Sequence, residues 1–173
     1  MTLGGRVKSL GMSERRWFVA HTRPRREKKL VDFCLRHEIA ATLPCYDSAH
    51  KYRGKTVVFR KPFFPGYVFL ELEQRWRDLV RQNEHVANLL EVFDQELFER
   101  QLKDILLALE TSLGVRLAPA IGEGMRVRIR SGPLQGVEGW VESRYGMAIV
   151  LLRLDFIGQA AAVKMDAEAL EPA

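Results

Sequence analysis

The sequence has no apolar run of about 18 residues, the length that a membrane-spanning helix requires. The opening residues also lack the apolar segment of a signal peptide. Only two cysteines are present, Cys34 and Cys45, which is too few for a disulfide framework and is typical of a reducing compartment. These absences indicate neither a membrane span nor export, so we expect a cytoplasmic protein without a membrane partner.

Sequence motifs of catalysis are also missing. No phosphate-binding glycine loop, nucleophile elbow or metalloprotease helix occurs, and Gly122 and Gly124 lack the following helix that a nucleotide site requires. None of the four histidines stands at a spacing from serine or cysteine that suggests a catalytic triad. We therefore expect a protein that is not an enzyme and that needs no cofactor.

Four potential zinc ligands lie near one another in the sequence, namely Cys34, His37, Cys45 and His50. Cys34 falls on the apolar face of a predicted helix, however, and Cys45 follows Pro44 in an apolar strand. This pattern favours two buried thiols over a metal site, so a zinc-dependent enzyme is the weakest functional alternative.

The sequence does contain enough apolar residues for folded domains and an excess of positive charge. Of its 173 residues, 47% are hydrophobic, and 27 Lys and Arg residues outnumber 22 Asp and Glu residues. The resulting net charge of +5 favours an anionic partner, with nucleic acid as the first candidate.

The first part of the chain alternates strand and helix patterns. Residues 1–14 carry three glycines and no periodic apolar pattern, which predicts a disordered leader. Strands are predicted at 16–20, 39–52, 55–61, 67–72 and 86–93, and helices from Pro24, at 75–83 and at 95–113. This order predicts an α+β domain over residues 15–113, with an antiparallel sheet and helices on it.

The rest of the chain changes character. Residues 114–121 begin at Gly114, include Pro119 and are followed by Gly122, which predicts a linker. Beyond the linker, short strands separated by turns with glycine are predicted at 125–129, 137–142, 148–154 and 160–165. Residues 122–173 are therefore expected to form a small all-β barrel.

Three segments resemble the NusG family of transcription factors. The first is Arg16-Trp17-Phe18-Val19-Ala20-His21-Thr22-Arg23-Pro24, and the second is Phe63-Phe64-Pro65-Gly66-Tyr67-Val68-Phe69. The third, residues 124–139, is similar to the KOW motif, which forms an SH3-like barrel. The three segments occur in the order and at the spacing of the family.

The resemblance implies an elongation and antitermination factor that binds the clamp helices of RNA polymerase and suppresses pausing. It also implies a KOW domain that recruits a second partner, either a ribosomal protein or the termination factor Rho. The residues that the family pattern places at the polymerase are Val19, Phe64, Pro65, Tyr67 and Phe69. The alternative is that these side chains belong to the core, and we expect some of them to be buried because a strand offers each face only alternate residues.

One segment departs from the pattern of the housekeeping members. Where those members carry a Thr-Pro-Gly-Val turn, this sequence reads Gln82-Asn83-Glu84-His85-Val86-Ala87. The chain is therefore more similar to a specialised paralogue of the RfaH kind, which acts on selected operons. In such proteins the small domain can form a helical hairpin that masks the polymerase site. The alanine-rich segment 160–170 fits a helix, but the glycines and valines of 124–141 favour a barrel.

Positive charge is concentrated in the first domain. Residues 15–36 hold eight basic residues against two acidic ones, and residues 51–61 add five more cations. The family pattern turns the basic helix toward the non-template DNA strand, and the residues that it places there are Arg23, Arg26, Lys29, Arg36 and His37. The alternative is a solvated helix face without a partner.

A second reading of the whole chain stays open. A KOW-containing ribosome-binding or RNA-binding protein would use the barrel and the basic helix to bind folded RNA directly. Salt-sensitive binding to naked RNA without polymerase would favour that reading. In either case we expect a monomer.

Overall fold

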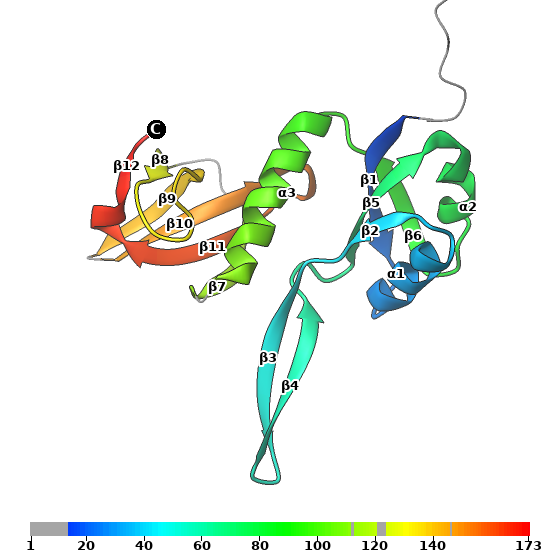
Figure 1. Cartoon of the computed structure of the whole chain (residues 1–173), viewed down its shortest axis with the longest axis horizontal. Coiled ribbons are helices and arrows are strands. Elements are labelled where there is room, and N and C mark those ends of the chain that lie inside the picture. The colour runs from blue at the N-terminus through cyan, green and yellow to red at the C-terminus, as the bar shows by residue number, and fades with distance from the viewer. Residues whose placement is uncertain (1–13, 112, 121–123, 146) are drawn as a thin grey trace, which may run out of the picture.

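The computed structural model describes residues 14–111, 113–120, 124–145 and 147–173, so nearly all of the predicted leader lies outside it. Figure 1 shows an α+β domain, a projecting hairpin and an all-β domain, with one long helix between the two domains. This arrangement confirms the predicted fold class, an antiparallel sheet with helices followed by a small all-β domain. None of the helices in the described residues is both long and apolar enough to span a membrane.

The first domain is built on a four-stranded antiparallel sheet in the order β2-β5-β1-β6. Its elements are β1 (Arg15–Thr22), α1 (Glu27–Arg36), β2 (Ala40–Thr42), β5 (Tyr67–Glu73), α2 (Arg77–Arg81), β6 (Val86–Glu91) and α3 (Gln95–Glu110). Opposite residues such as Phe18 and Leu70 share a face, as do Val19 and Phe69 one position further along. Each face of the sheet therefore carries its own group of apolar side chains.

The two faces of this sheet are covered by different helices. On one face Phe18 and Leu70 form a core with Leu30 of α1 and Val80 of α2. On the other face Val19 and Phe69 belong to the same core as Phe98, Leu102 and Ile105 of α3. The sheet is consequently enclosed between α1 and α2 on one side and α3 on the other.

Helix boundaries differ by a few residues from the sequence prediction. Arg25 adopts a positive φ of 60°, so α1 begins at Glu27 and not at Pro24. The side chain of Asp94 accepts a hydrogen bond from the Leu97 amide and caps α3, which ends at Glu110 rather than Leu113.

The second domain is a six-stranded antiparallel sheet in the order β12-β8-β9-β10-β11-β7. Its strands are β7 (Val115–Pro119), β8 (Met125–Ile129), β9 (Glu138–Tyr145), β10 (Met147–Leu154), β11 (Gln159–Asp166) and β12 (Leu170–Pro172). Five of the eight residues assigned to the linker thus form β7, which pairs with β11 at the edge of the sheet. Proline at the end of an edge strand leaves the pairing intact.

The alanine-rich tail forms β11 despite its preference for helix. Ala161 and Val163 pack into the main core, whereas Ala160 and Ala162 pack on the other face beside Leu151. Because β11 is buried on both faces, small side chains fit there, and tertiary packing overrides the helical propensity.

Two strands stand apart from both domains. β3 (Cys45–Tyr52) and β4 (Lys55–Pro62) pair with each other over their whole length and form a separate two-stranded sheet. Figure 1 shows that this hairpin projects away from the first domain.

Candidate functional site

The segment Phe63–Tyr67 forms a tight turn at the base of the hairpin. Phe63 and Phe64 are buried, Pro65 is exposed and Tyr67 is half-buried. The Tyr67 amide donates to the Phe64 carbonyl at 3.2 Å, and Gly66 supplies the positive φ of 86° that this turn requires. The turn therefore presents Pro65 and Tyr67 outward on top of buried phenylalanines.

Three contacts hold this turn against the first domain. The Gly66 amide donates to Glu27 Oε1 at 2.9 Å, and the Gly66 carbonyl accepts from the Thr22 amide at 2.8 Å. The Tyr67 ring stacks on the His21 ring with centroids 5.1 Å apart. Sequence reasoning did not single out Glu27; its only signal was an acidic side chain in the first turn of a helix, which usually indicates a favourable interaction with the helix dipole.

The structure brings together the five residues predicted to bind polymerase but exposes them unequally. Val19, Phe64 and Phe69 are buried, and Phe64 packs edge-on against Phe69 with centroids 6.0 Å apart. The ring of Phe98 on α3 lies 5.5 Å from that of Phe69 and covers it. Pro65 and Tyr67 form the accessible part of this surface.

A sixth apolar residue on the same face of the sheet stays accessible and was missed by sequence reasoning. Leu90 of β6 pairs with Val19 of β1, so both side chains point to the α3 face, and Leu90 is 46% exposed. Strand alternation alone does not find Leu90, because the position of α3 decides which residues of this face stay uncovered.

The residues predicted to bind DNA lie mainly on one stripe of α1. Helical spacing places Arg26, Lys29 and Arg36 on one side, whereas His37 follows the buried Leu30 by seven residues and so falls on the core face. The three cationic side chains are exposed, as is that of Arg23 in the preceding turn. Arg26 precedes the first helical residue, and the Arg23 amide donates to the His85 carbonyl at 2.9 Å.

His37 has a different environment from the four cations. Its Nδ1 lies 3.0 Å from the Phe33 carbonyl oxygen, and its ring lies 4.3 Å from that of Phe33 and 6.3 Å from that of Trp76. This half-buried ring packs against the end of its own helix, so it borders the stripe rather than projecting from it.

The four side chains considered as zinc ligands are in different environments. Cys34 lies in the core beneath α1, whereas His50 lies on the exposed hairpin, where its Nε2 is 3.0 Å from Lys61 Nζ. Burial raises the pKa of the Cys34 thiol to about 11. Burial also raises the pKa of Cys45, while the nearby Arg60 and Lys28 lower it. Within the described residues, no group of three or more His, Cys, Asp or Glu side chains is placed to hold a metal ion.

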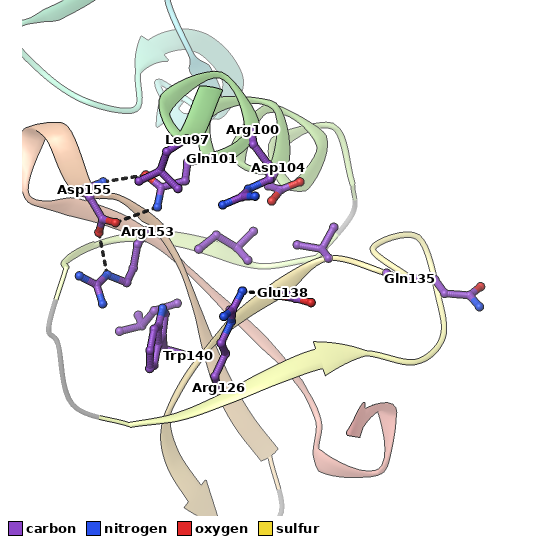
Figure 2. Close-up of a pocket in the computed structure, with 15 residues that line it drawn as sticks. Leu97, Arg100, Gln101, Asp104, Arg126, Gln135, Glu138, Trp140, Arg153 and Asp155 are labelled. Atoms are coloured by element: carbon purple, nitrogen blue, oxygen red, sulfur yellow. Dashed lines mark hydrogen bonds and ion pairs between the residues drawn. The ribbon is translucent and has the colours of Figure 1, made fainter. Parts of the chain in front are cut away.

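A large polar cavity lies between α3 and the second domain (Figure 2). Its volume is about 680 Å³, and it is lined by charges of both signs, among them Arg100, Asp104, Arg126, Glu138 and Arg153. Burial raises the pKa of Asp104, and hydrogen bonds from Arg128 and Arg126 lower that of Glu138. Arg126 pairs with Glu138 and Arg153 with Asp155 on the second-domain wall, while Arg100 and Asp104 line the wall formed by α3, so the cavity is part of the contact between the domains.

That contact is also made by direct bonds across the cavity rim. Gln101 Nε2 donates to Asp155 Oδ2 at 2.9 Å, and the Asp155 amide donates to Gln101 Oε1 at 3.0 Å. The Phe98 ring lies 6.2 Å from that of Phe156 in the second domain. Helix α3, which covers Phe69, therefore also contacts the second domain.

The chain is a two-domain protein, in which an α+β domain with helices on both faces of its sheet is joined to a small all-β domain. Residues 15–105 match the family described as transcription termination factor NusG. Because the match covers more than half of the chain, the chain belongs to the NusG family, which is a family of transcription factors and not of enzymes.

One solved structure agrees with this fold. A structure described as showing the domain interaction in Thermotoga maritima NusG is 16% identical with a TM-score of 0.54, covering 94% of this chain and 99% of that chain. A structure of the MjSpt4:Spt5 complex is 17% identical and covers 91% of this chain and 96% of that chain, but its TM-score of 0.28 supports no argument. No curated protein matches this chain significantly.

Proposed function

We propose that this chain is a cytoplasmic transcription elongation and antitermination factor that binds the clamp helices of RNA polymerase and suppresses pausing. In this proposal the all-β domain acts as a KOW domain that recruits either a ribosomal protein or Rho. Membership of the NusG family supports the proposal.

The observation that carries the proposal is the construction of the Phe63–Tyr67 turn. Pro65 and Tyr67 project outward, while Phe64 and Phe69 support them from the core. Aromatic side chains with few rotamers, held by packing from below, are the kind of anchor that dominates protein interfaces. Together with Leu90 they provide an apolar surface for the tip of a helical hairpin.

The buried members of the predicted set have a supporting role in this proposal. Val19, Phe64 and Phe69 form the floor on which Tyr67 rests, and Phe98 of α3 closes one side. The clamp helices then contact the accessible edge of the surface, and any deeper contact requires α3 to move.

The basic stripe of α1 is proposed to contact the non-template strand. Arg23, Arg26, Lys29 and Arg36 are exposed and none of them forms a described salt bridge, so their charges are available for phosphates. We expect this contact to weaken with increasing salt concentration. His37 contributes at the border of the stripe.

Operon selectivity of the RfaH kind is supported by the location of the divergent turn. The His85 carbonyl accepts the hydrogen bond of the Arg23 amide, so the turn at residues 82–87 adjoins a proposed DNA contact. A change in this turn therefore alters the surface next to the DNA strand.

The experiment that tests the proposal is binding of the intact chain to purified bacterial RNA polymerase, compared with Tyr67→Ala. Removing an aromatic anchor is expected to weaken binding by about tenfold or more. The matched control is Leu35→Ala, which removes an exposed apolar side chain from α1 on the opposite face of the sheet. Equal binding by both variants contradicts the proposed surface, and no binding by the unchanged chain contradicts the function.

A further inference from the structure

The β3–β4 hairpin is not needed for the core of either domain. Within the described residues its two strands pair only with each other, and most of their side chains are exposed. Figure 1 shows the ribbon projecting into solvent. Because an isolated two-stranded ribbon is marginally stable, large apolar side chains kept exposed on it indicate a binding partner.

The pairing register sorts the hairpin residues onto two faces, because directly opposite residues point the same way. The aromatic face consists of the rungs Tyr46 with Lys61, Ser48 with Phe59, His50 with Val57, and Tyr52 with Lys55. The reverse face consists of Asp47 with Arg60, Ala49 with Val58, and Lys51 with Thr56. Each rung of the aromatic face therefore carries one ring, and the reverse face carries none.

The rings of the aromatic face form an accessible, regularly spaced series. Tyr46 is 41% exposed, Phe59 is 51% exposed and Tyr52 at the far end is 68% exposed. Successive rungs on one face of a strand are about 7 Å apart. The ring of His50 continues the series, with its centroid 5.7 Å from that of Phe59.

Charge on the hairpin is distributed as unevenly as the rings. Asp47 is the only acid between residues 45 and 62, and it lies on the reverse face, 3.4 Å from the Arg60 guanidinium. The aromatic face has Lys55 and Lys61 and no carboxylate. At the tip, the Arg53 guanidinium lies 5.9 Å from the centroid of the Tyr52 ring.

We propose that the aromatic face of the hairpin binds single-stranded nucleic acid. Bases stack on the exposed rings, and Arg53, Lys55 and Lys61 attract the phosphates, which is the combination used by single-strand binding proteins. A duplex hides the faces of its bases, so it offers these rings nothing to stack on. The site is distinct from the α1 stripe and needs no polymerase, so it goes beyond the proposed function.

The test is fluorescence anisotropy with labelled 12-nucleotide oligothymidylate and oligouridylate and a 12-base-pair duplex, using the intact chain at low salt. Phe59→Ala is expected to weaken single-strand binding about tenfold. The matched control is Val58→Ala on the reverse face, which is similarly exposed and is expected to change affinity less than twofold. Tighter binding of a single-stranded oligonucleotide than of the duplex supports the proposal. The tighter of the two single strands then identifies DNA or RNA as the ligand.

A charge-matched pair keeps the test informative if loss of a ring distorts the ribbon. Lys55→Gln on the aromatic face is expected to weaken binding and reduce its salt dependence more than Lys51→Gln on the reverse face. A third variant, Lys29→Gln with Arg36→Gln, measures separately how much the α1 stripe contributes to oligonucleotide affinity.

Three outcomes overturn the proposal. They are absence of oligonucleotide binding at low salt, duplex binding as tight as single-strand binding, and equal affinity of Phe59→Ala and Val58→Ala together with equal affinity of the two lysine variants. If only the α1 variant loses affinity, the hairpin proposal is wrong while the proposed DNA contact of α1 stands. Polymerase binding by Tyr67→Ala is measured separately, so failure of the hairpin proposal leaves the proposed function intact.

Discussion

At the scale of single residues, Glu27 links the basic helix to the turn that presents Tyr67. Its carboxylate is buried at the start of α1 and accepts the Gly66 amide hydrogen bond from a turn far away in the sequence. This one contact couples the orientation of α1 to the position of Pro65 and Tyr67.

Removing that carboxylate is expected to destabilise the first domain. Glu27→Ala leaves the Gly66 amide without its acceptor and should lower the free energy of unfolding by about 1–3 kcal/mol, measured by urea denaturation. Glu27→Gln retains an oxygen acceptor and should lose less. If the two variants are equally stable, the hydrogen bond does not hold the turn.

Cys34 makes stability depend on alkaline pH. The pKa of the Cys34 thiol is about 11 in the folded state, above the value of 9.0 for an unburied thiol. The folded state therefore has its full stability relative to the unfolded state below pH 9, and the contribution from Cys34 is lost as the pH rises through 11. The loss should be about 2–3 kcal/mol. Urea denaturation between pH 8 and 11 should show a steeper decline for the unchanged chain than for Cys34→Ala, and parallel declines would contradict the assignment.

At the scale of elements, apolar periodicity predicted most strands and helices because each element has one buried face. Apolar periodicity failed where contacts with a segment distant in the sequence determine the secondary structure. The segment Val115–Pro119 was read as a linker from its proline and glycines, yet it pairs with β11 as an edge strand. The preference of the alanine-rich tail for helix was overridden because small side chains fit a strand that is covered on both faces.

Gly139 on β9 provides a test of packing within the second domain. A Cβ atom at this position would lie 2.6 Å from Val150 Cγ1 and 2.8 Å from the Leu151 carbonyl oxygen, so β10 has to shift. Gly139→Ala should destabilise the domain by about 1–3 kcal/mol, measured by thermal denaturation. The control is Gly114→Ala, where nothing lies within 4 Å of the added atom, and equal effects of the two changes would contradict the crowding.

At the scale of the whole molecule, α3 belongs to both domains. Phe98 contacts Phe69 and Trp17 in the first domain and Phe156 in the second. The sequence predicted this helix and its apolar stripe, but a single stripe does not reveal that two domains share it. For the same reason, sequence reasoning could group Val19, Phe64 and Phe69 but could not predict that α3 covers them, or that Leu90 stays accessible.

The hydrogen bonds between Gln101 and Asp155 hold the domains together at the surface. Asp155→Ala removes the side-chain bond to Gln101 and the ion pair with Arg153, and should speed amide exchange in α3 without lowering overall stability by more than about 1 kcal/mol. The control is Asp166→Ala, an exposed residue of the same domain whose side chain accepts a hydrogen bond from the Glu168 amide in the adjoining turn. Exchange in α3 that is unchanged by Asp155→Ala would show that the apolar contacts alone fix the domains.

The measurement that tests the account most directly is the dwell time of purified bacterial RNA polymerase at a defined pause site, with and without the intact chain. We predict that the chain shortens the pause, that Tyr67→Ala loses most of this effect and that Leu35→Ala retains it. A pause of unchanged length in the presence of a chain that is shown to be folded would contradict the proposed function.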